Sequence, residues 1–238
     1  PGAAGGASGD ILDFARKFLH ACQIRNAPLD FYSWHSYNRG HEGPYVFAKE
    51  AKMIRYALNA KGFNKALNVL SEWNVCNVRA GGNHPTDQDR EFKAMLWNMD
   101  GAAFSTAALT YLHLHSDVRY ACRYRGDIHS GDHGYGLINT DGTIKKPGYA
   151  FKAYAMLFPQ WNTVFRPEMY LLESAGGNLK DRTAMATTDG DRRVINVLIS
   201  LWKCGGEGFK LTISNVPQGW TSPKMEHYVV SPNYDCEQ

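Results

Sequence analysis

The sequence lacks the features that mark membrane proteins and nucleic-acid-binding proteins. No apolar run approaches the roughly 18 residues that a membrane-spanning helix needs. The formal net charge is only +3 and no block of like charges occurs, so neither a nucleic acid nor a membrane surface is expected as a partner. The first ten residues, PGAAGGASGD, have neither the basic region nor the apolar region of a signal peptide, and they are predicted to form a loop.

Cysteine is sparse as well, with 5 residues among 238 and no C-x-x-C spacing, so no metal site is expected. The odd number leaves at least one thiol free or paired with another chain, and the spacing leaves any disulfide pairing open. One or two disulfides would favour an extracellular or secretory location over the cytosol. The sequence contains no Asn-x-Ser/Thr glycosylation site that would support this location.

What is present is typical of a globular protein. Hydrophobic residues make up 44% of the chain, aromatic residues 13% and charged residues 21%. This composition excludes an intrinsically disordered chain. The length of 238 residues is enough for one large domain or two modest ones.

Residues 1–158 show helical periodicity alternating with short apolar runs. Helices are predicted over 10–25, 44–61, 86–115 and 146–158, and strands over 31–34, 65–72 and 117–124. Strands that alternate with helices of this length favour βαβ units and a parallel sheet. The fold class predicted for this part is therefore α/β.

The pattern changes from about residue 159 to the end of the chain. Short β-rich segments alternate with Gly, Asn, Asp and Pro, and ATTDGDRRVINVLI reads as a hairpin with Asp189 and Gly190 at its turn. Residues 159–238 are predicted to form an antiparallel β-sandwich domain.

Three parallel strands are too few for a closed fold. Such a sheet has two open edges and an uncovered apolar face. We therefore expect this chain to be the C-terminal part of a larger fold.

Two predicted strands end in distinctive motifs. The first is DFYSWHSYN, residues 30–38, and the second is LSEWN, residues 70–74. A carboxylate at the end of a buried strand is costly unless something there uses it. A third stretch, GLINTDGTIKKPGYAFKAYAML, follows in residues 136–157.

Together these segments resemble glycoside hydrolase family 39, whose members are retaining glycosidases built on a (β/α)8 TIM barrel. The first motif is similar to the sixth barrel strand of that family and the second to the end of its seventh strand. The third stretch is similar to the region that follows the eighth strand. The resemblance implies that residues 1–158 are the C-terminal part of such a barrel, about strands six to eight, and that an appended β-sandwich follows.

The resemblance also assigns roles to residues. Glu72 matches the catalytic nucleophile, which attacks the anomeric carbon and forms a glycosyl-enzyme. His35 and Tyr37 share one face of their strand and would bind the nucleophile or the sugar hydroxyls. Trp73, Asn74 and Tyr124 are further candidates for substrate binding, with Tyr124 in the place where the family often has a Trp. Trp73 is equally compatible with a packing role.

The resemblance is incomplete in one important respect. The acid/base of the family lies in an Asn-Glu pair on the fourth strand, and no Asn-Glu dipeptide occurs in this sequence. The N-terminal half of the barrel, as a second chain or a missing segment, is therefore the expected partner, with a carbohydrate as substrate and no cofactor. The alternative is a non-catalytic carbohydrate-binding or structural protein derived from a glycosidase barrel.

A cluster of Arg and His residues lies on the third predicted strand and in the loop that follows it. Arg119, Arg123 and Arg125, with His129 and His133, could bind an acidic sugar, because guanidinium groups bind carboxylates through two hydrogen bonds. A solvated surface is the other interpretation of this charge cluster, and it is the one that the sequence favours.

Overall fold

The computed structural model describes residues 11–38, 42–76, 86–128, 134–158, 163–165, 181–188, 193–204, 211–212, 219–220 and 223–237. The helices are α1 (Ile11–Ile24), α2 (Val46–Ala60), α3 (Asp87–Ala94), α4 (Met99–His115) and α5 (Lys146–Ala155). The strands are β1 (Phe31–Tyr37), β2 (Leu67–Asn74), β3 (Val118–Arg123), β4 (Thr163–Phe165), β5 (Asp181–Thr188), β6 (Ile195–Trp202), β7 (Val229–Val230) and β8 (Asp235–Glu237).

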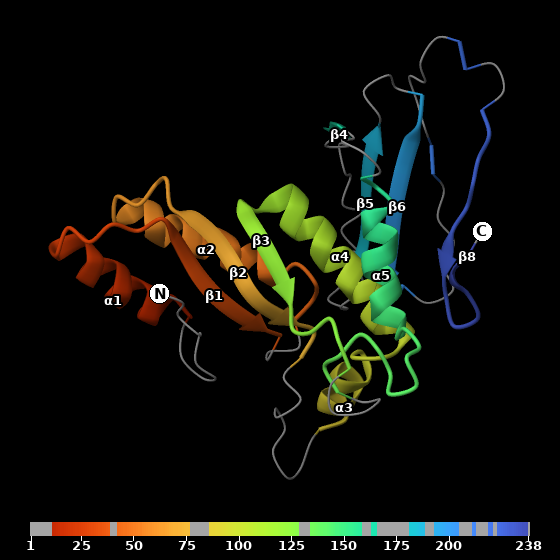
Figure 1. Cartoon of the computed structure of the whole chain (residues 1–238), viewed down its shortest axis with the longest axis horizontal. Coiled ribbons are helices and arrows are strands. Elements are labelled where there is room, and N and C mark those ends of the chain that lie inside the picture. Colours follow the sequence, from red (N-terminus) through yellow and green to blue (C-terminus); the bar gives the residue numbers. More distant parts are fainter. Residues whose placement is uncertain are drawn as a thin grey trace.

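The first part of the chain is a mixed α/β unit with a parallel sheet, as predicted. Strands β1, β2 and β3 lie side by side in chain order, and both pairs are parallel. Figure 1 shows α1 and α2 lying along this sheet, with α4 and α5 beyond β3. Each connection between neighbouring strands contains helix, which is the arrangement that parallel pairing requires.

One face of the sheet is buried against the helices. Trp34, Leu70 and Trp73 have no exposed surface, and the Trp73 ring lies 5.1 Å from the ring of Phe47 on α2. Large aromatic side chains of this kind supply most of the apolar area that leaves water on folding. This layer between the sheet and the helices is the core that positions the strand ends.

The long helical region predicted over 86–115 is divided into α3 and α4. Asn98 takes an extended backbone conformation, and its side chain accepts a hydrogen bond from the backbone N–H of Gly101 at 3.0 Å. This is an N-cap, so a new helix begins there. A side chain at Gly101 would collide with the Met95 carbonyl, because a Cβ there would lie 1.6 Å from its oxygen. The helical periodicity of the sequence continues across this point, which is why a single helix was predicted. The Asn98 cap starts a second helix there.

Helix α4 joins the parallel sheet to the β-rich part of the chain. The Phe104 ring of α4 lies 5.3 Å from the ring of Trp202 on β6, and Ser200 Oγ donates to the carbonyl of Ala103 at 2.6 Å. Because α4 is covered by neighbours on several sides, it is buried along most of its length. Trp202 belongs to the same hydrophobic core as the sheet.

The β-rich part is antiparallel in the residues that the structure describes. Strands β4, β5 and β6 form one sheet, and β7 pairs with β8 in a second, two-stranded sheet. The predicted hairpin is confirmed, because Thr188 of β5 pairs with Ile195 of β6. Its turn at Asp189 and Gly190, and the predicted strand MYLLES, lie outside the described residues. The β-sandwich itself therefore stays a prediction.

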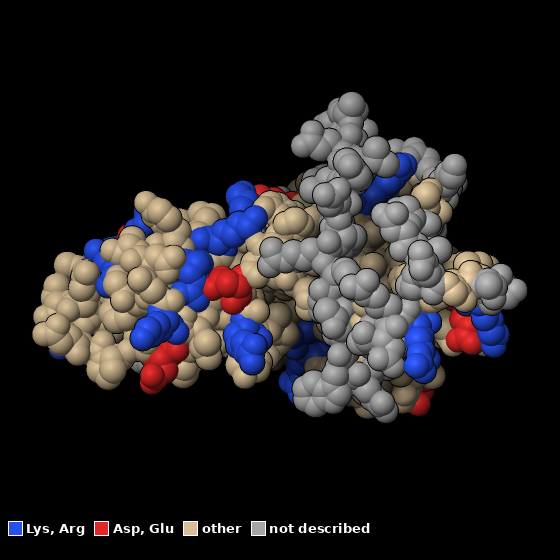
Figure 2. Space-filling view, turned by 90° about the horizontal axis from the view of Figure 1, so that it is seen from above, with Lys and Arg blue, Asp and Glu red and all other residues tan. Residues whose placement is uncertain are grey.

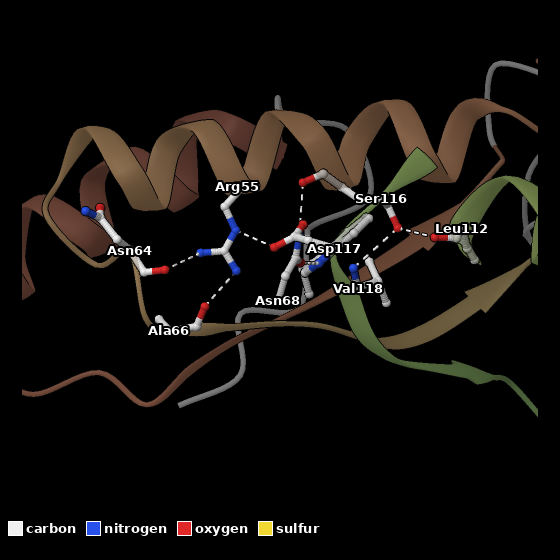
Figure 3. Close-up of polar contacts among 10 residues, drawn as sticks. Arg55, Asn64, Ala66, Asn68, Leu112, Ser116, Asp117 and Val118 are labelled. Carbon is white, nitrogen blue, oxygen red and sulfur yellow. Dashed lines mark hydrogen bonds and ion pairs between the residues drawn. The ribbon is translucent and has the colours of Figure 1, made fainter. Parts of the chain in front are cut away.

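A polar network joins the amino ends of β2 and β3 to helix α2 (Figure 3). Asn68 is fully buried, accepts from Trp34 Nε1 at 2.7 Å, and donates to the carbonyl of Ala51 and to Asp117. Arg55 of α2 pairs with the same Asp117 carboxylate and also donates to the backbone carbonyl of Ala66. The network satisfies the buried amide and links elements at the end of the sheet opposite to Glu72.

Among the described residues on the face that Figure 2 shows, Lys and Arg side chains stand apart and Asp and Glu lie among them. None of the helices in the described ranges is both long and apolar enough to cross a membrane. All 5 cysteines are free, so disulfides provide no argument about the compartment in which the protein works.

Candidate active site at the carboxyl ends of the parallel strands

A bulge in β2 directs Glu72 to the face of the sheet that α2 does not cover. Trp34 pairs with Leu70, but the next residue of β1, His35, pairs with Glu72, so Ser71 is an extra residue in β2. Because side chains alternate along a strand, Leu70 and Glu72 would otherwise point to the same side. Leu70 faces the core and Glu72 faces away from it. We call the side that carries His35 and Glu72 the inner face.

Hydroxyl groups hold this bulge in place. Ser71 Oγ lies 2.5 Å from Ser33 Oγ and donates to the carbonyl of Trp34 at 3.2 Å. Neither serine was predicted from the sequence. A signal was available, since a serine directly before the proposed nucleophile breaks the alternation of apolar residues in β2.

Glu72 has two polar neighbours from β1, and both were predicted. The Tyr37 hydroxyl donates to Glu72 Oε2 at 2.8 Å, and His35 Nδ1 lies 3.1 Å from the same oxygen. The side chain of Glu72 is 31% exposed and that of His35 is 25% exposed. The carboxylate is therefore oriented by neighbours and still accessible from the inner face.

The Tyr37 hydroxyl is a donor that stays protonated. Burial raises the pKa of Tyr37, and the hydrogen bond to Glu72 and its negative charge raise it further. A protonated phenol beside a carboxylate can only donate to it. This contact fixes the direction of Glu72 Oε2.

Asn74 and Trp73 lie differently from Glu72. Asn74 is fully buried, donates through Nδ2 to the carbonyl of Tyr124, and accepts from the backbone N–H of Val75 at 2.7 Å. It therefore ties the end of β2 to the end of β3. Trp73 is fully buried on the opposite side, between Phe47 and Phe151. In this chain Trp73 packs in the core, which is the second of the two roles predicted for it.

Tyr124 follows β3 and lies at the edge of the site. Its ring packs against the ring of Tyr135, 5.5 Å away, and Tyr135 in turn lies 5.9 Å from Tyr37. Tyr135 was not predicted from the sequence, because it lies in an irregular segment without periodicity. The HGYG pattern around Tyr135 was the only local signal, and it indicates a turn rather than a site.

The basic cluster on β3 and after it is not one surface. Arg123 lies in the layer between sheet and helices, where Nη1 donates to Ser105 Oγ at 2.9 Å. Arg125 forms an ion pair with Asp127. His129 and His133 lie outside the described residues. Arg123 is therefore not available to an acidic sugar in this structure, whereas Arg119 remains exposed.

The rest of the inner face is open. Phe31, Leu67 and Tyr120 carry apolar side chains on this face, and they are 43%, 44% and 57% exposed. Three large hydrophobic residues on one face of a sheet are unusual for a surface that meets only water. The pattern fits the interior of a barrel, where such side chains form stacked layers.

No family model and no curated protein matches the sequence. Solved structures do match. One is a glucosidase from Croceicoccus marinus, with a TM-score of 0.61 and 23% sequence identity. The match covers 84% of this chain and 38% of the glucosidase chain. Another is a GH39 β-xylosidase from Caulobacter crescentus, with a TM-score of 0.51 and 17% sequence identity. The match covers 80% of this chain and 36% of the β-xylosidase chain.

The chain has the fold of part of a family 39 glycosidase. The chain spans 38% and 36% of the lengths of the two neighbours, so it corresponds to a part of such a fold. The resemblance of the sequence to family 39 is thus confirmed at the level of the fold. In a glycosidase barrel, functional residues sit at the carboxyl ends of the strands, and Glu72, His35 and Tyr37 lie at the carboxyl half of β1 and β2.

Proposed function

We propose that this chain carries the nucleophile of a retaining glycoside hydrolase and that Glu72 is that nucleophile. The observation that carries the proposal is the pair of contacts to Glu72 Oε2, from the Tyr37 hydroxyl at 2.8 Å and from His35 Nδ1 at 3.1 Å. A nucleophilic carboxylate must be oriented and reachable, and these contacts orient Glu72 on an accessible face.

The reaction would proceed in two steps. Glu72 forms a bond to the anomeric carbon while the glycosidic oxygen leaves with a proton from the acid/base residue. Water then attacks the glycosyl-enzyme, loses its proton to the same acid/base residue, and releases Glu72. Tyr37 and His35 keep the attacking carboxylate in position through both steps.

The acid/base residue would come from the N-terminal half of the barrel. A retaining enzyme needs its second carboxyl group about 5 to 5.5 Å from the nucleophile. The sequence has no Asn-Glu pair to match that residue. Support for a missing barrel wall comes from the open inner face, where Phe31, Leu67 and Tyr120 are exposed.

The substrate class is a glycoside whose sugar fits beside Glu72. The structural neighbours are a glucosidase and a β-xylosidase, so aryl glucosides and aryl xylosides are the first substrates to test. The proposal includes no cofactor and no metal, because retaining hydrolysis needs only the two carboxyl groups.

The test is covalent labelling of the full-length protein with a 2-fluoro glucoside or a 2-fluoro xyloside. We expect one label, on Glu72, and we expect Glu72→Gln to lower kcat by at least about a thousandfold. A label on another residue, or unchanged turnover by Glu72→Gln, would overturn the assignment. Sugar binding without labelling or turnover would favour the non-catalytic carbohydrate-binding alternative.

A further inference from the structure

Three tyrosine rings pack together beside Glu72. Tyr135 lies between the other two, with ring centroids 5.9 Å from Tyr37 and 5.5 Å from Tyr124 and interplanar angles of 64° and 74°. These are edge-to-face contacts, the arrangement that aromatic pairs prefer. We call Tyr37, Tyr124 and Tyr135 the tyrosine cluster. Tyr135 is only 8% exposed, so its ring is enclosed by its neighbours.

The segment that carries Tyr135 is anchored to the barrel strands through its backbone. The N–H of Arg125, just after β3, donates to the carbonyl of Tyr135 at 3.3 Å. Lys145 is 2% exposed, and its Nζ donates to the carbonyl of Gly134 at 3.2 Å. Buried charged groups are rare unless they are paired, so this lysine holds the neighbouring backbone firmly. Tyr135 therefore offers Tyr37 a fixed surface.

We infer that Tyr135 is a positioning residue for the nucleophile and acts through Tyr37. The Tyr135 ring packs against the Tyr37 ring and restricts its movement. The Tyr37 hydroxyl therefore stays 2.8 Å from Glu72 Oε2. The inference rests on the proposed function and adds to it a residue that does not touch the carboxylate. A displacement of about 1 Å in such a contact is enough to slow catalysis strongly.

The protonation behaviour of Tyr37 fits this geometry. Burial is the largest cause that raises the pKa of Tyr37, and Tyr135 is one of the groups that cover it. Removing the Tyr135 ring would let water reach the phenol. The pKa of Tyr37 would then fall toward the ordinary value of about 10.

The first experiment follows the ionisation of Tyr37 by NMR in the full-length protein with 13C at the tyrosine Cζ, and Tyr37→Phe assigns the signal. Wild-type Tyr37 should stay protonated up to the highest pH at which the protein remains folded. Tyr135→Leu should bring the Tyr37 midpoint into the measured range, because water replaces the ring. Tyr135→Phe keeps the ring and should behave as the wild type. No Tyr37 midpoint within that range in Tyr135→Leu would overturn the inference, and so would the same midpoint in Tyr135→Leu and Tyr135→Phe.

A second buried tyrosine controls for general loss of stability. Tyr111 of α4 is 4% exposed, and its ring packs against Tyr45 at 5.1 Å instead of against the tyrosine cluster. Tyr111→Leu should lower thermal stability to a similar extent and leave the Tyr37 midpoint unchanged. A shift of the Tyr37 midpoint by Tyr111→Leu as large as that by Tyr135→Leu would overturn the specific role of Tyr135.

The second experiment measures the rate at which a 2-fluoro glycoside labels Glu72. Tyr135→Leu should slow labelling at saturation about tenfold or more with little change in the apparent affinity, and Tyr135→Phe should restore most of the rate. Equal labelling rates in wild type and Tyr135→Leu would contradict the inference. If the wild-type protein takes no label at all, the proposed function fails, and the Tyr37 titration still decides whether Tyr135 positions Tyr37.

Discussion

Arg123 is a charged side chain inside an apolar layer. Its guanidinium lies 5.6 Å from the Trp73 ring and 5.9 Å from the Phe151 ring, and its one hydrogen bond goes to Ser105. Nε and Nη2 are buried without an acceptor. Burial lowers the pKa of Arg123 to about 10. The positive charge is therefore less favourable in the folded state than in the unfolded state, and this cost is present at every pH below about 10.

Replacing the charge should stabilise the fold. We expect Arg123→Met to raise the free energy of unfolding at pH 7 by about 1 kcal/mol or more, because the apolar side chain removes two unpaired donors and keeps the stem packing. Urea unfolding measures the change. Arg25→Met, at an exposed position, should change the free energy of unfolding by less than about 0.5 kcal/mol. A loss of stability in Arg123→Met would mean that the ring contacts outweigh the burial of the charge.

Strand β2 shows how one element serves both stability and the site. Its amino end carries Asn68, which bonds to Trp34 of β1, to the backbone of α2 and to Asp117 next to β3. Its carboxyl end carries Glu72 on the opposite face. The bulge at Ser71 separates the two ends and changes the face that the following side chains use.

Loss of the amide at the amino end should weaken the whole sheet. We expect Asn68→Ala to lower the free energy of unfolding by about 2 to 4 kcal/mol, because the buried Trp34 Nε1 loses its acceptor and the Ala51 carbonyl and Asp117 each lose a donor. Denaturant unfolding followed by tryptophan fluorescence measures this. Asn64→Ala is the matched control, since Asn64 is exposed and contributes its backbone carbonyl to Arg55. A loss below about 1 kcal/mol in Asn68→Ala would contradict the role of the network.

On the scale of the whole molecule, the open inner face is the main feature that a complete barrel would change. Cys122 lies two residues after Tyr120 on β3, so both side chains point to this face, and both are exposed. In a closed barrel these positions face the interior. Cys22 on α1 lies on the helical side of the sheet and provides an internal comparison.

Closure of a barrel should protect one thiol selectively. We expect iodoacetamide to modify Cys122 readily in this chain and at least about tenfold more slowly in the full-length protein, since access would require local opening. Cys22 should react at similar rates in both. Mass spectrometry of the peptides measures the two rates. Equal reactivity of Cys122 in both proteins would mean that the N-terminal part does not close over the inner face.

The sequence by itself determined the order of the elements and the motif around Glu72. Helical periodicity and short apolar runs depend on local preference and burial, so α1, α2 and the three parallel strands could be predicted within a few residues. The resemblance of DFYSWHSYN and LSEWN to family 39 named Glu72, His35 and Tyr37, and the structure brings these three together.

Only the tertiary structure decided which face each side chain occupies. Alternation from Leu70 alone would put Glu72 on the core side and Trp73 on the inner face, and the bulge at Ser71 reverses the two. Tyr135 follows Glu72 by more than sixty positions along the chain. Only folding packs the Tyr135 ring beside Tyr37, which binds Glu72. Periodicity reports local burial, whereas a bulge and a contact between distant segments depend on the register of neighbouring strands and on how loops return to the sheet.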